Sequence, residues 1–164
     1  MSRDTSRLVT LMAEAVDFSV RHVEAGGLPF VGLLVADDGS VSDPGVNLVR
    51  ETGDPSAHAE IVAMRHVLQE RGLTSLKGMT LLATGEPCAL CYRFAAEHGV
   101  DAVHFAVDRT TVARWGFDYR SSYDALGTDR LLIAQGAQLV TVDRGLEPFA
   151  RFLELHGTAL APQH

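Results

Sequence analysis

Apolar side chains recur at helical spacing near the start of the chain, at Leu8, Leu11, Met12, Ala15, Val16, Phe18 and Val23. This period predicts an amphipathic helix over residues 4–24. The glycine pair Gly26-Gly27 follows directly and marks the end of that helix, because glycine is common just after a helix C-terminus.

Further along, short apolar runs alternate with longer amphipathic segments. The runs predict strands at 30–36, 41–49, 79–83 and 102–107 and a last strand from residue 137, with Asp38-Gly39 as a hairpin turn after the first. The amphipathic segments predict helices at 58–70, 87–98, about 129–135 and 145–155. The order α-β-β-α-β-α-β-α-β-α is typical of the α/β class, with a mixed sheet covered by helices on both faces.

The composition fits one domain spanning residues 1–164, with 46% hydrophobic and 21% charged residues. No charged-then-apolar leader opens the chain and no apolar run is long enough to cross a bilayer. We therefore expect a soluble cytoplasmic protein with no membrane partner. The formal net charge of −7 repels phosphate backbones and disfavours a nucleic-acid partner.

The segment TGEPCALC, residues 84–91, contains both cysteines of the chain. Three interpretations of Cys88 and Cys91 are open. They are two core residues, a thioredoxin-type redox pair, or two metal ligands.

His58 and Glu60 favour metal ligation. Catalytic zinc takes three protein ligands and keeps one position for water. Cys88 and Cys91 lie on one face of a predicted first helical turn, where the dipole favours thiolates, and His58 begins a second helix after a Gly/Pro loop. If Cys88 and Cys91 were a redox pair, their chemistry would give Glu60 no role. The other six histidines are interpreted as structural.

The segments His58-Ala59-Glu60 and Pro87-Cys88-Ala89-Leu90-Cys91 match the pattern H-x-E…P-C-x-x-C. On this pattern the chain resembles the zinc-dependent cytidine deaminase superfamily. Four further segments extend the resemblance over roughly residues 27–126: LPFVGLLVADDG, GVN, DPSAHAE and RWGFDYRSSYDAL. The last of them is similar to a segment of the bacterial guanine deaminase branch.

The resemblance implies a three-layer α-β-α fold around a five-stranded mixed sheet, and one Zn²⁺ per chain. It also implies that Glu60 is the catalytic residue, which moves protons from the activated water to the substrate. A solvated helix charge is the alternative for Glu60. Members of the superfamily commonly form homodimers, and in the guanine branch the C-terminal segment, here about residues 145–164, can pack on the partner subunit.

Four residues are candidates for binding the substrate: Asn47, Phe30, Ala59 and Asp118. By resemblance, Asn47 would read the edge of the base with its amide, which offers both a donor and an acceptor. The alternative role for Asn47 is that of a turn residue, and the alternative role for Phe30 is that of a core residue. Asp118 and Trp115 would close the pocket, with a surface loop as their alternative.

The expected pocket departs from the guanine deaminase pattern. Tyr119 stands where that branch has a second acid after Gly-Phe-Asp, and Glu97 stands where it tends to have an aromatic residue stacked on the base. Tyr92 and Arg93 replace small residues just after the cysteines. Glu86 is interpreted as structural.

Hydrolytic deamination of a small aminated nucleobase or nucleoside, guanine-like or cytosine/cytidine-like, is the function that the sequence favours. The first alternative is a tRNA adenosine deaminase, which would need a basic groove. Residues 37–55 carry one arginine and five acidic residues, which disfavours it. The second alternative is a non-catalytic module stabilised by zinc, which would not need Glu60.

Overall fold

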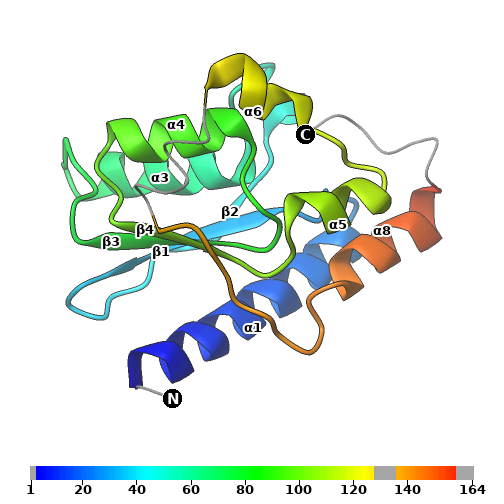
Figure 1. The fold of residues 1–164 in the computed structure, drawn as a ribbon, viewed down its shortest axis with the longest axis horizontal. Helices are drawn as coiled ribbons and strands as arrows, with labels where there is room; N and C mark the ends of the chain where they lie inside the picture. The colour runs from blue at the N-terminus through cyan, green and yellow to red at the C-terminus, as the bar shows by residue number, and fades with distance from the viewer. Residues whose placement is uncertain (1–2, 128–135, 158–164) are drawn as a thin grey trace.

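The computed structural model of the protein describes residues 3–127 and 136–157. A five-stranded sheet lies at its centre, with helices on both faces (Figure 1). The strands are β1 (Val31–Ala36), β2 (Gly45–Val46), β3 (Met79–Ala83), β4 (Ala102–Phe105) and β5 (Gln138–Leu139). The helices are α1 (Arg3–Glu24), α2 (Val49–Thr52), α3 (Ala59–Glu70), α4 (Ala89–Glu97), α5 (Arg109–Arg114), α6 (Ser121–Leu126) and α8 (Glu147–His156).

The sheet has the strand order β2-β1-β3-β4-β5 and mixes two directions. β1 runs antiparallel to β2 and β3, whereas β3, β4 and β5 are parallel. α4 makes the crossover that the parallel neighbours β3 and β4 require. The α/β class and the five-stranded mixed sheet are therefore confirmed.

Two helical layers cover the sheet. α3 and α4 lie on one face, and α1 lies on the other with α8 packed beside it (Figure 1). α1 buries the apolar stripe seen in its sequence, because Met12, Val16 and Val23 have no exposed surface. The chain turns just after α1 at Gly26, whose φ of 103° suits glycine and strains other residues. None of the described helices has both the length and the apolar character needed to cross a membrane.

The helices predicted at 4–24, 58–70, 87–98 and 145–155 are present, with ends within two residues of the prediction. The aromatic and polar region after β4 holds two short helices that were not predicted. Asp108 caps α5 by accepting from the Thr111 N–H at 2.8 Å. α5 and α6 have six residues each, too few to show a helical period. The helix predicted at 129–135 lies outside the described residues.

The strand predicted at 41–49 is wrong over most of its length. β2 has two residues, and Val41 makes only an isolated bridge to β1. Pro44 has no N–H to donate, so it interrupts the ladder. The Asn47 Oδ1 then accepts from the Val49 N–H at 3.0 Å and turns the chain into α2. The last strand is also shorter than predicted, because β5 too has two residues.

Two glycines let the start of α3 approach the sheet closely. A Cβ added to Gly32 of β1 would lie 2.9 Å from the Cα of Glu60. A Cβ added to Gly45 of β2 would lie 2.5 Å from the carbonyl oxygen of Ala59. The first turn of α3 therefore rests directly on the backbone of two strands, which fixes its position.

Gly45→Ala is expected to lower the free energy of unfolding by about 1–3 kcal/mol, because the added methyl group meets backbone atoms of α3 that cannot move alone. Urea unfolding of both proteins measures the difference. Val46→Ala is a matched control, since it changes the neighbouring residue without adding atoms and should cost less. An unchanged midpoint for Gly45→Ala would show that α3 can shift freely away from β2.

Candidate metal centre and active site

The N-termini of α3 and α4 meet, and they bring the three predicted metal ligands together. His58 is the N-cap residue of α3, Cys88 is the N-cap residue of α4, and Cys91 lies in the first turn of α4. His58 Nδ1 lies 3.3 Å from Cys88 Sγ and 3.5 Å from Cys91 Sγ, and the sulfur atoms are 3.6 Å apart. All three residues are buried, and the cysteines are free thiols.

These separations fit a tetrahedral zinc ion. Zn–S bonds of about 2.3 Å and a Zn–N bond of about 2.0 Å would place the sulfur atoms roughly 3.8 Å apart and nitrogen roughly 3.5 Å from each sulfur. The measured distances lie close to both values. Within the described part of the chain, the group has three side chains, which leaves a fourth position open as in catalytic zinc sites.

The electrostatics of the cluster also favour a cation. Burial raises the pKa of the Cys91 thiol well above its ordinary value, and Cys88 and Glu60 raise it further. Burial acts to lower the pKa of His58, but the hydrogen bond and charge of Cys88 and the charge of Glu60 outweigh it, so this pKa is raised. Thiolates beside a carboxylate in the core need a compensating positive charge, which Zn²⁺ would supply.

Glu60 is buried beside the sulfur atoms. It lies in the first turn of α3 without exposed surface, and Cys91 Sγ donates to its Oε2 at 3.4 Å. The alternative interpretation, a solvated charge on the helix surface, is therefore wrong. A carboxylate in this place can exchange protons with a molecule at the open position.

The Glu86 carboxylate anchors the loop in front of Cys88. It accepts from the Arg109 N–H at 2.8 Å and from the Tyr92 hydroxyl at 3.1 Å. The Glu86 N–H also donates to the Val107 carbonyl at 2.8 Å, which joins the loop to the segment after β4. These contacts agree with the structural role predicted for Glu86.

Two further tyrosines hold the same loop and were not predicted from the sequence. Tyr119 donates to the backbone carbonyl of Glu86, and Tyr123 donates to that of Pro87. They are 33 and 36 positions away from these partners, so no local motif could reveal the contacts. In the sequence, the one indication of an unusual role was that Tyr119 stands where the guanine deaminase branch has a second acid after Gly-Phe-Asp.

Asn47 lies half-buried beside a cavity of about 690 Å³, which Leu28 and Phe152 also line. Its Oδ1 accepts from the Val49 N–H, so Asn47 is a turn residue, and a ligand would meet its Nδ2 group. Its contact with substrate stays a prediction.

Phe30 has no exposed surface and packs among other rings. Its centroid lies 5.2 Å from that of Phe117 and 5.5 Å from that of Phe149, both edge to face. This placement agrees with a core residue. Ala59 is also fully buried, and Trp115 is partly buried against the core.

Asp118 and Glu97 lie on the surface, with side chains 52% and 64% exposed. Asp118 pairs with Arg120 at 2.8 Å, and Glu97 pairs with Arg93 at 3.8 Å. The structure therefore does not bring either carboxylate into the buried cluster.

Comparison with known proteins gives a match over residues 5–107 to the cytidine and deoxycytidylate deaminase zinc-binding region. The chain is 34% identical over 110 residues to the guanine deaminase of Bacillus subtilis, which covers 66% of this chain and 70% of that protein. The X-ray structure of the Bacillus subtilis guanine deaminase has a TM-score of 0.65 at 29% identity, covering 94% of this chain and 95% of that one. A tRNA-specific adenosine deaminase of Aquifex aeolicus is 35% identical over 71 residues, covering 43% of this chain and 46% of that protein.

The family match contains all three candidate ligands and Glu60, and it spans more than half of the chain. The similarity of fold to the structure of the Bacillus subtilis protein extends along nearly the whole length of both chains. The protein therefore belongs to the cytidine and deoxycytidylate deaminase zinc-binding family, and it is a zinc-dependent hydrolytic deaminase that acts on C–N bonds.

Proposed function

We propose that this enzyme deaminates a small free nucleobase, guanine or a closely related aminopurine, and releases ammonia. The observation that carries the proposal is the buried Glu60 carboxylate beside the ligand atoms of His58, Cys88 and Cys91. The similarity to the Bacillus subtilis guanine deaminase, over 66% of this chain, supports the choice of base.

When Zn²⁺ is held by the three ligands, it supplies a Lewis acid that brings the pKa of a coordinated water toward neutrality. Glu60 takes the two protons of this water in turn and gives one to the ring nitrogen and the other to the amino group. The water oxygen bonds to the amino-bearing carbon, the C–N bond breaks, and ammonia leaves. Because Glu60 is buried, each proton moves directly between its carboxylate and the reactants.

For recognition of the base, the proposal relies on Asn47. Its Nδ2 group would donate to an acceptor on the ring edge, since its Oδ1 already accepts from the Val49 N–H. Phe30 and Ala59 have no exposed surface, so a contact of either with the ring stays a prediction. Asp118 is given no contact with substrate, because it lies on the surface in an ion pair with Arg120.

A tRNA adenosine deaminase is the second candidate, and the similarity to the Aquifex aeolicus protein favours it. That similarity covers 43% of this chain, less than for the guanine deaminase. Residues 37–55 carry one arginine and five acidic residues, and the formal net charge is −7. Such a surface repels the phosphates of RNA, so the small base is the better candidate.

We also propose that the enzyme is a cytoplasmic homodimer. α8 packs on α1 of its own chain, with Arg144 paired to Asp17 at 2.6 Å. Leu146 and Leu155 are 44% and 45% exposed at the two ends of this helix, which offers apolar contacts to a second copy. Packing of the segment from residue 145 on a partner subunit stays a prediction.

Glu60→Gln is expected to lower kcat by about three orders of magnitude, because the amide cannot accept the protons that the carboxylate transfers. Zinc content and the thermal midpoint should change little, since the amide is nearly the same size. Steady-state ammonia release measures kcat, and Glu70→Gln at the exposed end of α3 is the control. Turnover near that of the unmodified enzyme would mean that another group transfers the protons.

The proposed substrate is tested by ammonia release from guanine, guanosine, cytosine, cytidine, adenine and a tRNA anticodon stem-loop. We expect guanine to give the highest kcat/KM. Glu97→Ala should leave KM for guanine unchanged, because this carboxylate is 64% exposed on α4. Activity on the stem-loop alone would replace the proposal with tRNA adenosine deamination.

A further inference from the structure

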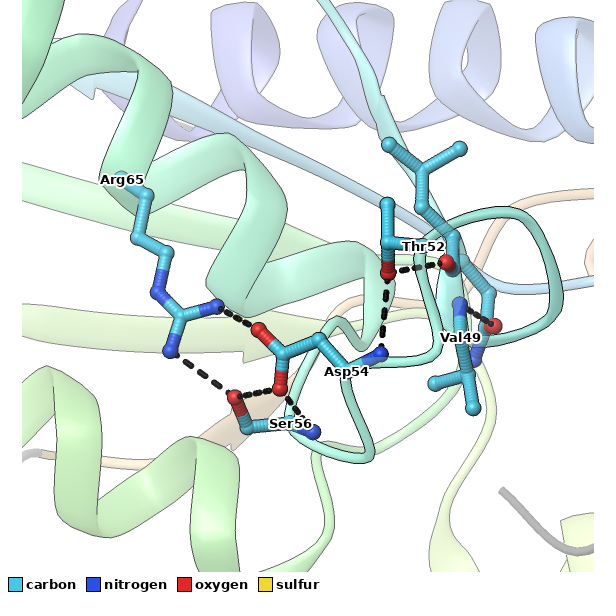
Figure 2. A network of polar contacts seen from close by, with 7 residues as sticks. Val49, Thr52, Asp54, Ser56 and Arg65 are labelled. Atoms are coloured by element: carbon cyan, nitrogen blue, oxygen red, sulfur yellow. Dashed lines mark hydrogen bonds and ion pairs between the residues drawn. The ribbon is translucent and has the colours of Figure 1, made fainter.

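The segment 47–58, which leads from β2 to α3, is held by hydrogen bonds of its own (Figure 2). Thr52 Oγ1 donates to the Leu48 carbonyl at 2.7 Å and accepts from the Asp54 N–H at 3.2 Å. The Leu48 N–H donates to the Ala57 carbonyl at 2.9 Å. The two ends of the segment are therefore tied to each other.

Arg65, on the second turn of α3, reaches back to this segment (Figure 2). Its Nη1 donates to Asp54 Oδ2 at 2.9 Å, and its Nη2 donates to Ser56 Oγ at 2.8 Å. Ser56 in turn donates to Asp54 Oδ1 from its N–H at 2.9 Å and from its hydroxyl at 2.7 Å. The Arg65 Cζ also lies 5.6 Å from the centroid of the Phe94 ring in α4. One guanidinium therefore connects the segment to both helices that hold the metal ligands.

The residues that Arg65 binds are joined to His58 through the backbone, because the His58 N–H donates to the Ser56 carbonyl at 2.8 Å and the Ala57 N–H donates to the Asp54 carbonyl at 3.1 Å. His58 is the N-cap residue of α3, and its Nδ1 lies 3.3 Å from Cys88 Sγ and 3.5 Å from Cys91 Sγ. Groups that support a metal-binding histidine from outside the ligand set orient its ring and affect how tightly the metal is held. The position of the Ser56 backbone therefore affects how His58 presents Nδ1.

We propose that Arg65 is a positioning residue for the metal centre, because its hold on Asp54 and Ser56 fixes the backbone that leads into His58 and thereby the place of the His58 imidazole. Arg65 and Asp54 are each 44% exposed, and an exposed ion pair alone adds little to fold stability. The effect of Arg65 is therefore on metal retention more than on unfolding. The inference rests on the zinc centre and is independent of the base that the enzyme deaminates.

The test follows zinc release from the full-length, zinc-loaded protein into an excess of a chromogenic chelator. Arg65→Ala removes both hydrogen bonds of the guanidinium, to Asp54 Oδ2 and to Ser56 Oγ. Arg65→Lys keeps the charge but cannot bind both of these oxygens in the same way. Arg71→Ala is the matched control, because Arg71 lies at the other end of α3 and bonds Ser40 at 3.3 Å, away from the segment. Thermal midpoints of the zinc-depleted proteins report fold stability separately.

Arg65→Ala is expected to release zinc about 10-fold faster, the lower end of the effect of losing support around a metal-binding histidine. Arg65→Lys should restore part of the difference, and Arg71→Ala should match the unmodified protein. The proposal is overturned if Arg65→Ala releases zinc at the same rate as Arg71→Ala. It is also overturned if the faster release goes with a lower thermal midpoint of the zinc-depleted Arg65→Ala protein, because the loss of fold stability would then explain it.

If Arg65→Ala does not fold, Ser56→Ala decides, because it removes one of these two hydrogen bonds and leaves the guanidinium in place. Faster zinc release from this variant supports the proposal, and an unchanged rate overturns it. Zinc release needs no substrate, so its failure would leave the proposed deamination intact. A failure of every base to react would likewise leave the result on Arg65 intact.

Discussion

The burial of two cysteines, a histidine and a glutamate around one point is the constraint on which the rest of the structure depends. These groups lose their hydration in the core, which raises the pKa of the Cys91 thiol, so the sulfur atoms carry negative charge there only when a cation compensates it. α3 and α4 meet this constraint by starting at the same place, with the positive ends of both helices toward the cluster. Gly32 and Gly45 then let α3 lie directly on the sheet, so that its first turn is fixed.

The ligands are supported from two sides by different chemistry. On the Cys88 side, buried tyrosine hydroxyls bind the loop, and burial raises the pKa of Tyr92 and Tyr123, so both remain protonated donors. On the His58 side, the support is the ion pair between Arg65 and Asp54, and both of these side chains are half-exposed. Contacts in the core therefore fix the positions of the two cysteines, whereas a hydrogen-bond network near the surface fixes the position of His58.

The local part of this arrangement could be predicted from the sequence, and the non-local part could not. The spacing of His58, Glu60, Cys88 and Cys91 identified the cluster because each pair lies within one helical turn of its own helix. The strand at 41–49 failed because Pro44 breaks the ladder and Asn47 turns the chain. Asp118 and Glu97 were ambiguous because sequence does not show which way a side chain faces. The tyrosine contacts cross more than 30 positions and needed the fold.

X-ray absorption at the zinc edge, measured on the full chain, tests the central claim most directly. The account predicts two sulfur atoms at about 2.3 Å and two lighter atoms at about 2.0 Å, the His58 nitrogen and a solvent oxygen. Addition of a base that competes for the open position should alter only the lighter shell. A spectrum without sulfur, or with more than two sulfur atoms per metal, would contradict an open site built from His58, Cys88 and Cys91.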